Sequence, residues 1–372
     1  MINALYAALI VGILSAVLAA LITIVDSIVN NYGEVTVDIN NGSKKLKVNG
    51  GTPLLFTLSE TGIFIPSACG GKGSCGACKV KILSDVGPIL PTEAPLLSDE
   101  EMKNNIRLSC QVKVKQDISI EIPEELFSVK QFSTKVESIK DVTHDIKEVK
   151  LKLLNPKEVE FKAGQYAQLV IPPYDKIKDS TQRAYSISAQ PSIKDSMEFL
   201  IRLVPGGIAT TYVHNHLKEN ANIEVVGPFG DFFVRETNAD MVCVAGGSGM
   251  APIKSIIYDL YEKGEKNRNI WYFFGARSLK DLFYLDELKD LEKKMPNFKF
   301  IPALSEPLPE DDWKGETGLI TDVLDKYFKE FISKENDKEG YLCGSPGMIN
   351  ACINVMKSNG LKEEKVYYDK FA

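Results

Sequence analysis

An uninterrupted apolar stretch opens the chain. Residues 4–25 carry no charged side chain, and only Ser15 and Thr23 break the apolar run. A helix rises roughly 1.5 Å per residue, so this stretch is long enough to cross a hydrocarbon layer of about 30 Å. A signal peptide would begin with Lys or Arg, which the first residues lack, and a core helix would present a polar face. The pattern predicts a transmembrane anchor over residues 1–30.

Short alternating stretches follow this apolar run. Residues 34–39 and 45–48 flank the turn Asn40-Asn41-Gly42, which predicts a β-hairpin. A short helix is expected over residues 52–60, and a further strand over residues 118–122 follows a glycine-rich, cysteine-containing loop. We therefore expect a small α+β domain over residues 34–125, and a linker over residues 123–130.

Strand signals dominate the middle of the chain, where Gly and Pro separate the apolar segments. These segments are residues 148–153, 166–171, 197–203 and 222–226. Many short strands joined by Gly- and Pro-containing turns are typical of a closed all-β domain. The pattern predicts an antiparallel Greek-key β-barrel over residues 131–235.

The pattern changes character near Ala239. Strands are expected at residues 241–244 and 270–275, and they alternate with helical periodicity at 252–263 and 281–294. Alternating β and α elements indicate a parallel sheet with crossover helices. This last domain is expected over residues 238–372, which makes the fold class multidomain: an anchor helix, an α+β domain, a β-barrel and an α/β domain.

Charge limits the choice of partners. The formal net charge is −6 and there is no basic stripe, so nucleic acid is not an expected partner. Lys44, Lys45 and Lys47 follow the predicted anchor, whereas no basic residue precedes it. By the positive-inside rule, the soluble domains lie on the cytoplasmic side of a membrane that the anchor crosses once.

Four of the seven cysteines form a distinctive pattern. Cys69, Cys75 and Cys78 give C-x5-C-x2-C with glycines between them, and Cys110 follows later. A [2Fe–2S] cluster needs four thiolates, two for each iron, and glycines let the backbone and its N–H groups approach the sulfides. The alternative is a zinc site, which would normally have a second C-x2-C pair. The spacing favours a [2Fe–2S] cluster as the metal centre, and the segment resembles the ferredoxin β-grasp domain, although most plant-type ferredoxins carry C-x4-C-x2-C.

A second motif, Arg183-Ala184-Tyr185-Ser186, is expected to open a strand, after an earlier strand that starts near Tyr166. Glycine-containing segments follow at residues 206–212 and 227–231. An Arg can neutralise a pyrophosphate, a Tyr ring can pack on a flavin, and the first N–H groups of a helix starting at Thr210 or Thr211 can bind phosphate. The plainer interpretation is that Tyr185 belongs to the barrel core and Thr210 is an ordinary N-cap.

These residues resemble the FAD-binding barrel of the ferredoxin–NADP+ reductase superfamily. The resemblance implies an FAD site and a flavin-binding role for Arg183, Tyr185 and Ser186. Further candidate residues of the cofactor site are Tyr166, Ala184, Thr210 and Thr211.

A third motif, Gly246-Gly247-Ser248-Gly249, links an apolar strand to a helix. It differs from the G-x-G-x-x-G fingerprint but resembles the nucleotide-binding loop of the same superfamily, in which glycines allow close approach to a pyrophosphate. Cys343-Gly344 matches the superfamily's C-G-x-P segment, whose Cys lies beside the nicotinamide and shapes the hydride path. No Arg cluster follows Arg277, so NADH is favoured over NADPH. Cys243 and Cys352 are expected in the core.

The order of the three soluble domains resembles two groups of proteins. One is the reductase components of soluble multicomponent oxygenases. The other is the F subunit of Na+-translocating NADH:quinone reductases, which has an N-terminal membrane helix, the C-x5-C-x2-C spacing, and acidic residues followed by Phe near its end, as Asp369 and Phe371 stand here. In that family the terminal aromatic ring stacks near the flavin, so Phe371 is the candidate stacking residue.

The second resemblance implies a membrane-anchored enzyme within a respiratory complex. Electrons would pass from NADH to FAD, to [2Fe–2S], to partner membrane subunits and finally to quinone, with Na+ transport. One departure is that only residues 172–182 occupy a position where the family carries a long insertion. The alternatives are an anchored oxygenase reductase, a reductase for another membrane acceptor, and a non-catalytic redox scaffold.

Overall fold

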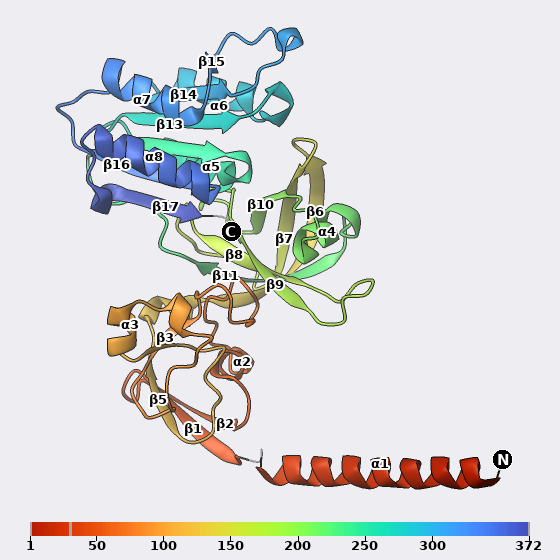
Figure 1. Ribbon diagram of the computed structural model, residues 1–372. Helices are drawn as coiled ribbons and strands as arrows, with labels where there is room; N and C mark the ends of the chain where they lie inside the picture. Colours follow the sequence, from red (N-terminus) through yellow and green to blue (C-terminus); the bar gives the residue numbers. More distant parts are fainter. Residues whose placement is uncertain (1, 30–31, 371–372) are drawn as a thin grey trace. The chain divides into compact units, whose positions relative to one another are not determined.

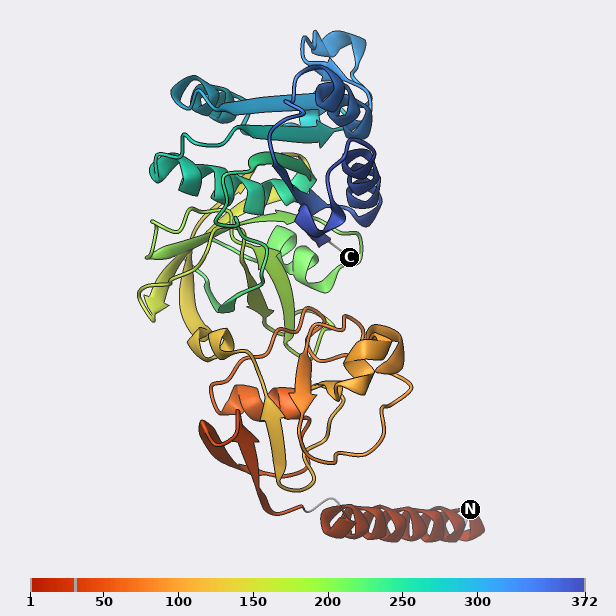
Figure 2. The same cartoon turned by 90° about the vertical axis from the view of Figure 1, so that its left-hand side faces the viewer.

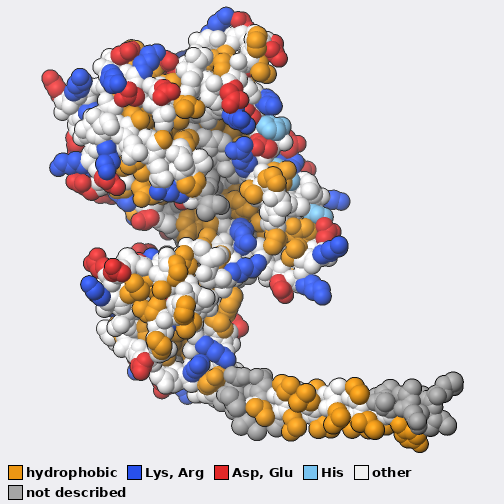
Figure 3. All heavy atoms as spheres, in the orientation of Figure 1, with side chains coloured by type: hydrophobic (Ala, Val, Ile, Leu, Met, Phe, Trp, Pro, Cys, Tyr) orange, Lys and Arg blue, Asp and Glu red, His pale blue; other side chains and the backbone are white. Residues whose placement is uncertain are grey.

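The computed structural model describes residues 2–29 and 32–370, with the side chains of the first helix described only in part. Two compact units, Met1–Val129 and Lys130–Ala372, divide the chain (Figure 1 and Figure 2). The first unit begins with helix α1, Ile2–Val29, whose described apolar side chains are exposed (Figure 3); Leu9 is 57% and Ile22 61% exposed. Over the described residues, no helix is both long enough and apolar enough to cross a membrane. The membrane anchor stays a prediction.

A five-stranded sheet in the order β2-β1-β5-β3-β4 forms the framework of the first unit. The predicted hairpin is present, and its turn residues Asn40 and Asn41 have positive φ angles of 52° and 53°, which Asn tolerates better than most residues. β1 pairs with β2 in antiparallel and with β5 in parallel. The elements are β1 Glu34–Ile39, β2 Lys44–Asn49, α2 Leu54–Glu60, β3 Lys79–Ile82, η1 Ala94–Leu96, α3 Asp99–Lys103, β4 Ile106–Leu108, β5 Ile118–Glu121 and η2 Glu124–Ser128.

The core of this sheet lies under helix α2. Leu54, Leu55 and Leu58 of the helix are buried against apolar strand residues such as Val37 and Ile120. Cys78 and Cys110 belong to the same buried cluster, so two of the four candidate ligands are anchored in the core. The segment predicted as a linker contains the 3₁₀ turn η2.

Six antiparallel strands in the order β10-β7-β6-β11-β8-β9 form the first half of the second unit. Ile187, directly after β9, makes a β-bridge to Phe199 of β10, which joins the two edge strands. Ala167, Leu169 and Ile171, at alternate positions of β8, face the buried interior. The elements are β6 Lys130–Asp141, β7 Ile146–Asn155, β8 Tyr166–Ile171, β9 Thr181–Ser186, β10 Ser196–Arg202, α4 Ile208–Asn215 and β11 Asn222–Phe229.

A parallel six-stranded sheet in the order β15-β14-β13-β12-β16-β17 forms the second half of this unit. Its central strands are nearly all buried because helices cover both faces (Figure 2). The elements are β12 Asp240–Gly246, η3 Gly247–Gly249, α5 Met250–Glu262, β13 Ile270–Ala276, η4 Leu279–Asp281, α6 Leu285–Lys294, β14 Phe298–Leu304, η5 Pro309–Asp311, β15 Glu316–Thr317, α7 Ile320–Glu330, β16 Lys338–Gly344, α8 Pro346–Ser358, η6 Glu363–Lys365 and β17 Val366–Lys370.

Alternate residues of each parallel strand contact helices on opposite faces. Cys243 and its neighbours on one face pack with α5 and α6, and Val242 and its neighbours on the other pack with α7 and α8. Cys243 and Cys352 are both 0% exposed, which confirms that they belong to the core. The α/β domain is thus a doubly wound sheet, as the alternating pattern predicts.

Two local predictions are wrong. Arg183-Ala184-Tyr185-Ser186 ends strand β9 rather than opening one, because antiparallel pairing with β8 already begins at the Ile171–Thr181 pair. The helix expected to start at Thr210 or Thr211 is α4, which starts at Ile208 with Gly207 as its N-cap. Gly206, with φ of 73°, makes the turn that allows this earlier start.

Candidate functional site

Positive backbone angles shape the cysteine loop of the first unit. Gly70, Gly71, Gly73 and Gly76 have φ angles of 67°, 84°, 71° and 67°, a region that residues with a Cβ rarely adopt. A Cβ at Gly71 would lie 2.6 Å from the ring of Phe56, so the backbone also passes close to a side chain there. The loop therefore depends on its glycines, as the sequence predicts for a cluster-binding segment.

The four cysteines of this loop form two pairs. The sulfur atoms of Cys69 and Cys75 are 3.4 Å apart, and the thiols of Cys78 and Cys110 lie close enough to shift each other's pKa. Burial raises the pKa of Cys69, but bonds from Ser74 and Cys75 outweigh it and bring that pKa to about 6. The Cys78 thiol lowers the pKa of Cys110 to about 6. Two thiol pairs suit a cluster that takes two thiolates on each of two irons.

Polar groups beside these pairs fit the same cluster. The amide of Gln111 lies 3.6 Å from the Cys110 sulfur, and the backbone N–H of Ser109 donates to the Cys78 carbonyl at 2.8 Å. The buried Ser109 hydroxyl makes no hydrogen bond within the described part of the chain. Over those same residues, no group of three His, Cys, Asp or Glu side chains is arranged to hold a metal ion. Four thiols are the donor set that a [2Fe–2S] cluster takes.

In the second unit, strand β9 carries the second motif at its carboxyl end. Arg183 and Tyr185 alternate onto one face of the strand, and the guanidinium of Arg183 donates one hydrogen bond, to the Gln182 carbonyl at 2.7 Å. Ser186 and Ala184 lie on the other face, opposite Tyr166 and Gln168 of β8. The amide nitrogen of Gln168 is buried and has no hydrogen-bond partner among the described residues. Such an orphaned donor is consistent with a bound polar group along this strand pair.

Helix α4 begins close by with an open amino end. Its N-cap Gly207 supplies no side-chain hydrogen bond, so the first N–H groups are left for a ligand such as phosphate. The Thr210 hydroxyl is 3.1 Å from the N–H of Val204 and 3.4 Å from the Gly207 carbonyl, and it is 8% exposed. Thr210 therefore braces the turn before the helix, whereas Thr211 is half-buried on the first turn.

The glycine loop of the parallel sheet touches the Cys343 segment directly. A Cβ at Gly249 would lie 2.2 Å from the carbonyl oxygen of Cys343, so only glycine fits. A Cβ at Gly344 would lie 3.6 Å from the backbone nitrogen of Gly246. Gly247 and Ser248, half-buried, lead into helix α5, whose N-cap Gly249 supplies no side-chain bond. This combination of a strand end, a glycine loop and an uncapped helix N-terminus can bind the pyrophosphate of a dinucleotide.

Asp369 is a candidate site residue that the sequence motifs did not reveal. It pairs in register with Cys343 across β16 and β17, and its carboxylate lies 3.5 Å from the Ser186 hydroxyl. Burial raises the pKa of Asp369, as does nearby Asp231, although the Ser186 contact lowers it. Burial also raises the pKa of Cys343 well above its usual value, so this thiol is neutral near pH 7. The ending Tyr368-Asp369-Lys370 was the sequence signal that could have identified Asp369.

Arg202 is a second residue that the motifs did not reveal. Its guanidinium lies 3.3 Å from where a Cβ of Gly247 would stand, so the last residue of β10 reaches the nucleotide loop. Asp145 accepts a 2.6 Å hydrogen bond from Nε of Arg202. Burial alone would raise the pKa of Asp145, but the bond from Arg202 and the other favourable contacts outweigh burial, so the pKa is lowered. A basic residue near the end of the predicted strand 197–203 was its sequence signal. Phe371, the predicted stacking residue, lies outside the described residues.

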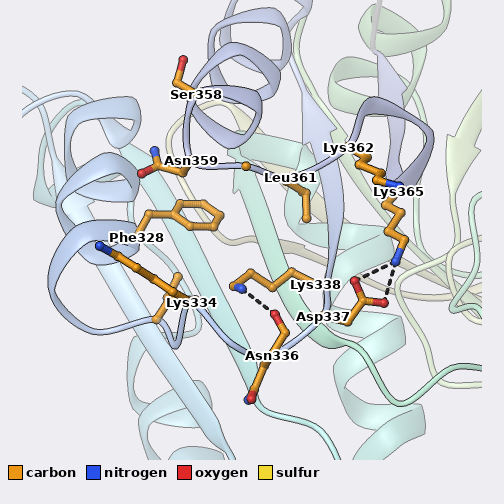
Figure 4. A pocket seen from close by; sticks show the side chains of 12 residues that line it. Phe328, Lys334, Asn336, Asp337, Lys338, Ser358, Asn359, Leu361, Lys362 and Lys365 are labelled. Atoms are coloured by element: carbon orange, nitrogen blue, oxygen red, sulfur yellow. Dashed lines mark hydrogen bonds and ion pairs between the residues drawn. The ribbon is translucent and has the colours of Figure 1, made fainter.

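A cavity of about 450 Å³ has none of the motif residues in its lining. Figure 4 shows side chains that line it. Its lining includes Lys338 at the first position of β16, whereas Cys343 and Gly344 are at the last two. Two of its lysines already bind groups of the cavity lining: Lys365 pairs with Asp337, and Lys338 donates to the Asn336 carbonyl. The candidate site is therefore the motif cluster at the carboxyl ends of the strands, where α/β sheets bind ligands.

Comparison with known families agrees with this division of the chain. The sequence matches a 2Fe-2S iron-sulfur cluster binding domain over residues 37–115, an oxidoreductase FAD-binding domain over 133–234 and an oxidoreductase NAD-binding domain over 243–353. These matches follow the order in which the thiol pairs, the β9 motif and the glycine loop occur.

Solved structures show the same fold. A cytochrome P450 reductase, GcoB, of Amycolatopsis has a TM-score of 0.72 and 26% identity, covering 91% of this chain and 98% of that one. A ferredoxin reductase in carbazole 1,9a-dioxygenase has a TM-score of 0.68 and 24% identity, covering 91% and 99%. The second likeness is one of fold alone.

Curated relatives match almost the whole chain. The F subunit of the Na(+)-translocating NADH-quinone reductase of Klebsiella pneumoniae subsp. pneumoniae is 38% identical over 392 residues, covering 95% of this chain and 96% of the relative. The same subunit of Pseudoalteromonas atlantica is 38% identical over 401 residues, covering 97% and 98%. With its cluster, FAD and NAD domains in this order, the chain belongs to the F-subunit family of Na(+)-translocating NADH-quinone reductases, as an NADH oxidoreductase that uses FAD and a [2Fe–2S] cluster.

Proposed function

We propose that this chain is the electron-input subunit of a membrane-bound Na+-translocating NADH:quinone reductase. The observation that carries the proposal is that two thiol pairs and a nucleotide site with Cys343 and Asp369 occur in one chain, 95% of which aligns at 38% identity with the F subunit of such an enzyme. FAD held by the β8, β9 and α4 residues would supply two-electron acceptance from NADH and one-electron release toward a [2Fe–2S] cluster held by the four cysteines. The role of the protein is to position these partners.

For the cluster we assign all four cysteines of the loop, Cys69, Cys75, Cys78 and Cys110. One pair would bind one iron and the second pair the other. The 3.4 Å separation of the Cys69 and Cys75 sulfurs supports the first pairing, and the mutual effect of the Cys78 and Cys110 thiols on their pKa values supports the second. The neighbouring N–H groups stabilise the thiolates.

For FAD we assign the residues of β8, β9 and α4. Arg183 binds the pyrophosphate, and Tyr166, Ala184, Tyr185 and Ser186 line the flavin. Thr211, on the open first turn of α4, contributes to phosphate binding, while Thr210 braces that turn through its bonds to Val204 and Gly207. The unpartnered amide of Gln168 opposite Ala184 supports a bound polar group there.

For NADH we assign the glycine loop and the β16 end. Gly246, Gly247, Ser248 and Gly249 carry the pyrophosphate on backbone N–H groups, and Cys343 with Gly344 shapes the nicotinamide pocket. The close approach of Gly249 to the Cys343 carbonyl supports a single continuous site. Phe371 would cover the flavin until the nicotinamide displaces it.

The membrane setting is part of the proposal. Residues 1–30 would anchor the chain once in the cytoplasmic membrane, with the cluster domain 34–125, the FAD domain 131–235 and the NAD(H) domain 238–372 on the cytoplasmic side. The exposed apolar side chains of α1 support this setting. Partner membrane subunits would receive the electrons for quinone reduction, since the relatives are named as one subunit of such an enzyme.

The decisive experiment is anaerobic reduction of the purified full-length protein with NADH, followed by EPR spectroscopy. We expect flavin bleaching and a [2Fe–2S] signal from wild-type protein, and bleaching without that signal from Cys110→Ser. A wild-type protein with its cysteines intact that takes up hydride but gives no [2Fe–2S] signal would contradict the proposal.

The alternative is the reductase component of an oxygenase, which the likeness to the Amycolatopsis P450 reductase favours. Purification in detergent separates the two functions. Co-purification with membrane subunits and NADH-dependent quinone reduction support the respiratory role. Electron delivery to an oxygenase partner, without quinone reduction, would support the alternative.

A further inference from the structure

One charged pair is deeply buried among the described residues of the first unit. Glu93 is 0% exposed and Arg107 is 5% exposed. Arg107 donates from Nε to Oε1 at 3.0 Å and from Nη2 to Oε2 at 2.6 Å, a bidentate arrangement. Moving two charges out of water is costly, so apolar residues of similar volume would serve stability equally well. The pair therefore calls for a role beyond stability.

The pair is hydrogen-bonded to the segment that carries Cys110. Glu93 accepts the backbone N–H of Leu108 at 3.0 Å, at the end of β4. The next residue, Ser109, donates its N–H to the Cys78 carbonyl at 2.8 Å. A chain of short contacts thus runs from the carboxylate to the backbone of both cysteines in the second thiol pair.

Arg107 also hydrogen-bonds to the loop that precedes Glu93. Its Nη1 donates to the Gly87 carbonyl at 2.9 Å and its Nη2 to the Pro88 carbonyl at 3.0 Å. Glu93 also accepts the N–H of Leu90 at 3.0 Å, so the loop that covers β4 is held by the same two side chains. Burial raises the pKa of Glu93, but these bonds outweigh it and lower that pKa, so the carboxylate is ionised.

We propose that the Glu93–Arg107 pair positions the Cys78–Cys110 half of the cluster site and that, because its two charges cancel, it keeps either charge alone from shifting the reduction potential of the cluster. This inference rests on the proposed function. Buried charges and hydrogen bonds around an iron–sulfur cluster determine how readily it takes an electron. The intact pair is neutral, but either member alone would leave a full charge in a low-dielectric interior, where Coulomb interactions are strong. Arg107 alone would favour the added electron, and Glu93 alone would oppose it.

The test is a redox titration of full-length, cluster-loaded protein, monitored by EPR. We expect the midpoint potential to rise in Glu93→Gln, to fall in Arg107→Gln, and to return toward the wild-type value in the double variant. The matched control is Glu121→Gln, which breaks the exposed Lys81–Glu121 pair of the same sheet, with side chains 42% and 49% exposed. Solvent screens that pair, so no shift is expected.

A purely structural role would lower cluster content or thermal stability without opposite shifts in potential. If the glutamine variants lose the cluster, Glu93→Asp and Arg107→Lys keep both charges but move them. We expect these variants to retain the cluster with altered EPR g-values, and unaltered g-values and potentials would overturn the inference. Absence of the signal from wild-type protein would instead refute the proposed function.

Discussion

At the scale of single residues, Asp369 is a partly buried carboxyl whose surroundings disfavour its negative charge. Its pKa is raised from 3.8, first by burial and then by Asp231. The folded state therefore binds the proton more tightly than the unfolded state. Its contribution to stability is complete below pH 3.8 and is lost as the pH rises through the raised pKa.

We expect Asp369→Asn to raise the melting temperature at neutral pH and to have no such effect below about pH 4, where the native carboxyl is already neutral. Thermal unfolding followed at several pH values measures this. Asp337→Asn is the control. Lys365 lowers the pKa of this exposed carboxyl, so this variant is expected to lower the melting temperature at neutral pH rather than raise it. A lower melting temperature for Asp369→Asn at pH 7 would contradict the expectation.

Arg202 gives a second prediction at this scale. Its guanidinium is beside Gly247, so it can donate to the pyrophosphate of a bound dinucleotide. Hydrogen bonds to charged groups contribute roughly 1.5–3 kcal/mol, so Arg202→Gln should raise the KM for NADH by about 10-fold or more. The value of kcat should change little.

Steady-state NADH–ferricyanide kinetics measure both constants. Lys152→Gln is the control, because Lys152 lies in the same barrel on β7 and pairs with Asp195 at the surface. An unchanged KM in Arg202→Gln would remove this residue from the nucleotide site.

At the scale of elements, the close contact between the glycine loop and β16 shapes the proposed nucleotide site. A Cβ at Gly249 would meet the Cys343 carbonyl carbon at 2.7 Å and its oxygen at 2.2 Å, and both are backbone atoms that cannot move cheaply. We expect Gly249→Ala to destabilise the protein by about 1–3 kcal/mol. It should also weaken NADH binding while FAD content stays at the wild-type level.

Chemical denaturation and NADH titration test this prediction. The control is Gly347→Ala in the first turn of α8, where nothing lies within 4 Å of the added Cβ. That variant should be neutral or more stable by about 0.5–1 kcal/mol, because Ala favours helix over Gly. Equal destabilisation in both variants would show that the contact between the added Cβ at position 249 and the Cys343 carbonyl is not the cause of the lost stability.

Local pattern was enough to predict elements whose signal lies within a few residues. The hairpin at Asn40–Asn41 and the strand Tyr166–Ile171 are as predicted, because alternation and turn residues are local properties. The position of Arg183 within β9 and the start of α4 were not, because pairing with β8 and the Gly206 turn decide them. The place of Asp369 beside Cys343 depends on a parallel pairing that no local pattern reveals.

At the scale of the whole molecule, the proposed anchor predicts that membrane attachment can be removed without loss of NADH oxidation. Deletion of residues 1–30 should release the protein from the membrane fraction on lysis while NADH–ferricyanide activity is retained, because the assigned flavin and nucleotide residues all lie beyond Lys130. Fractionation with activity assays of both forms provides the measurement. A truncated protein that still sediments with membranes would show that other contacts hold it there.

The long separation between Ser186 and Asp369, 183 positions along the chain, bears on how the protein is made. A ribosome completes the unit Met1–Val129 well before it reaches β17, and domains generally fold as units in the order of synthesis. The thiol pairs can therefore form and receive iron while the hydride site is still unfinished. Contacts between distant segments also form slowly. A nascent chain would thus acquire its means of passing electrons onward before it can draw them from NADH.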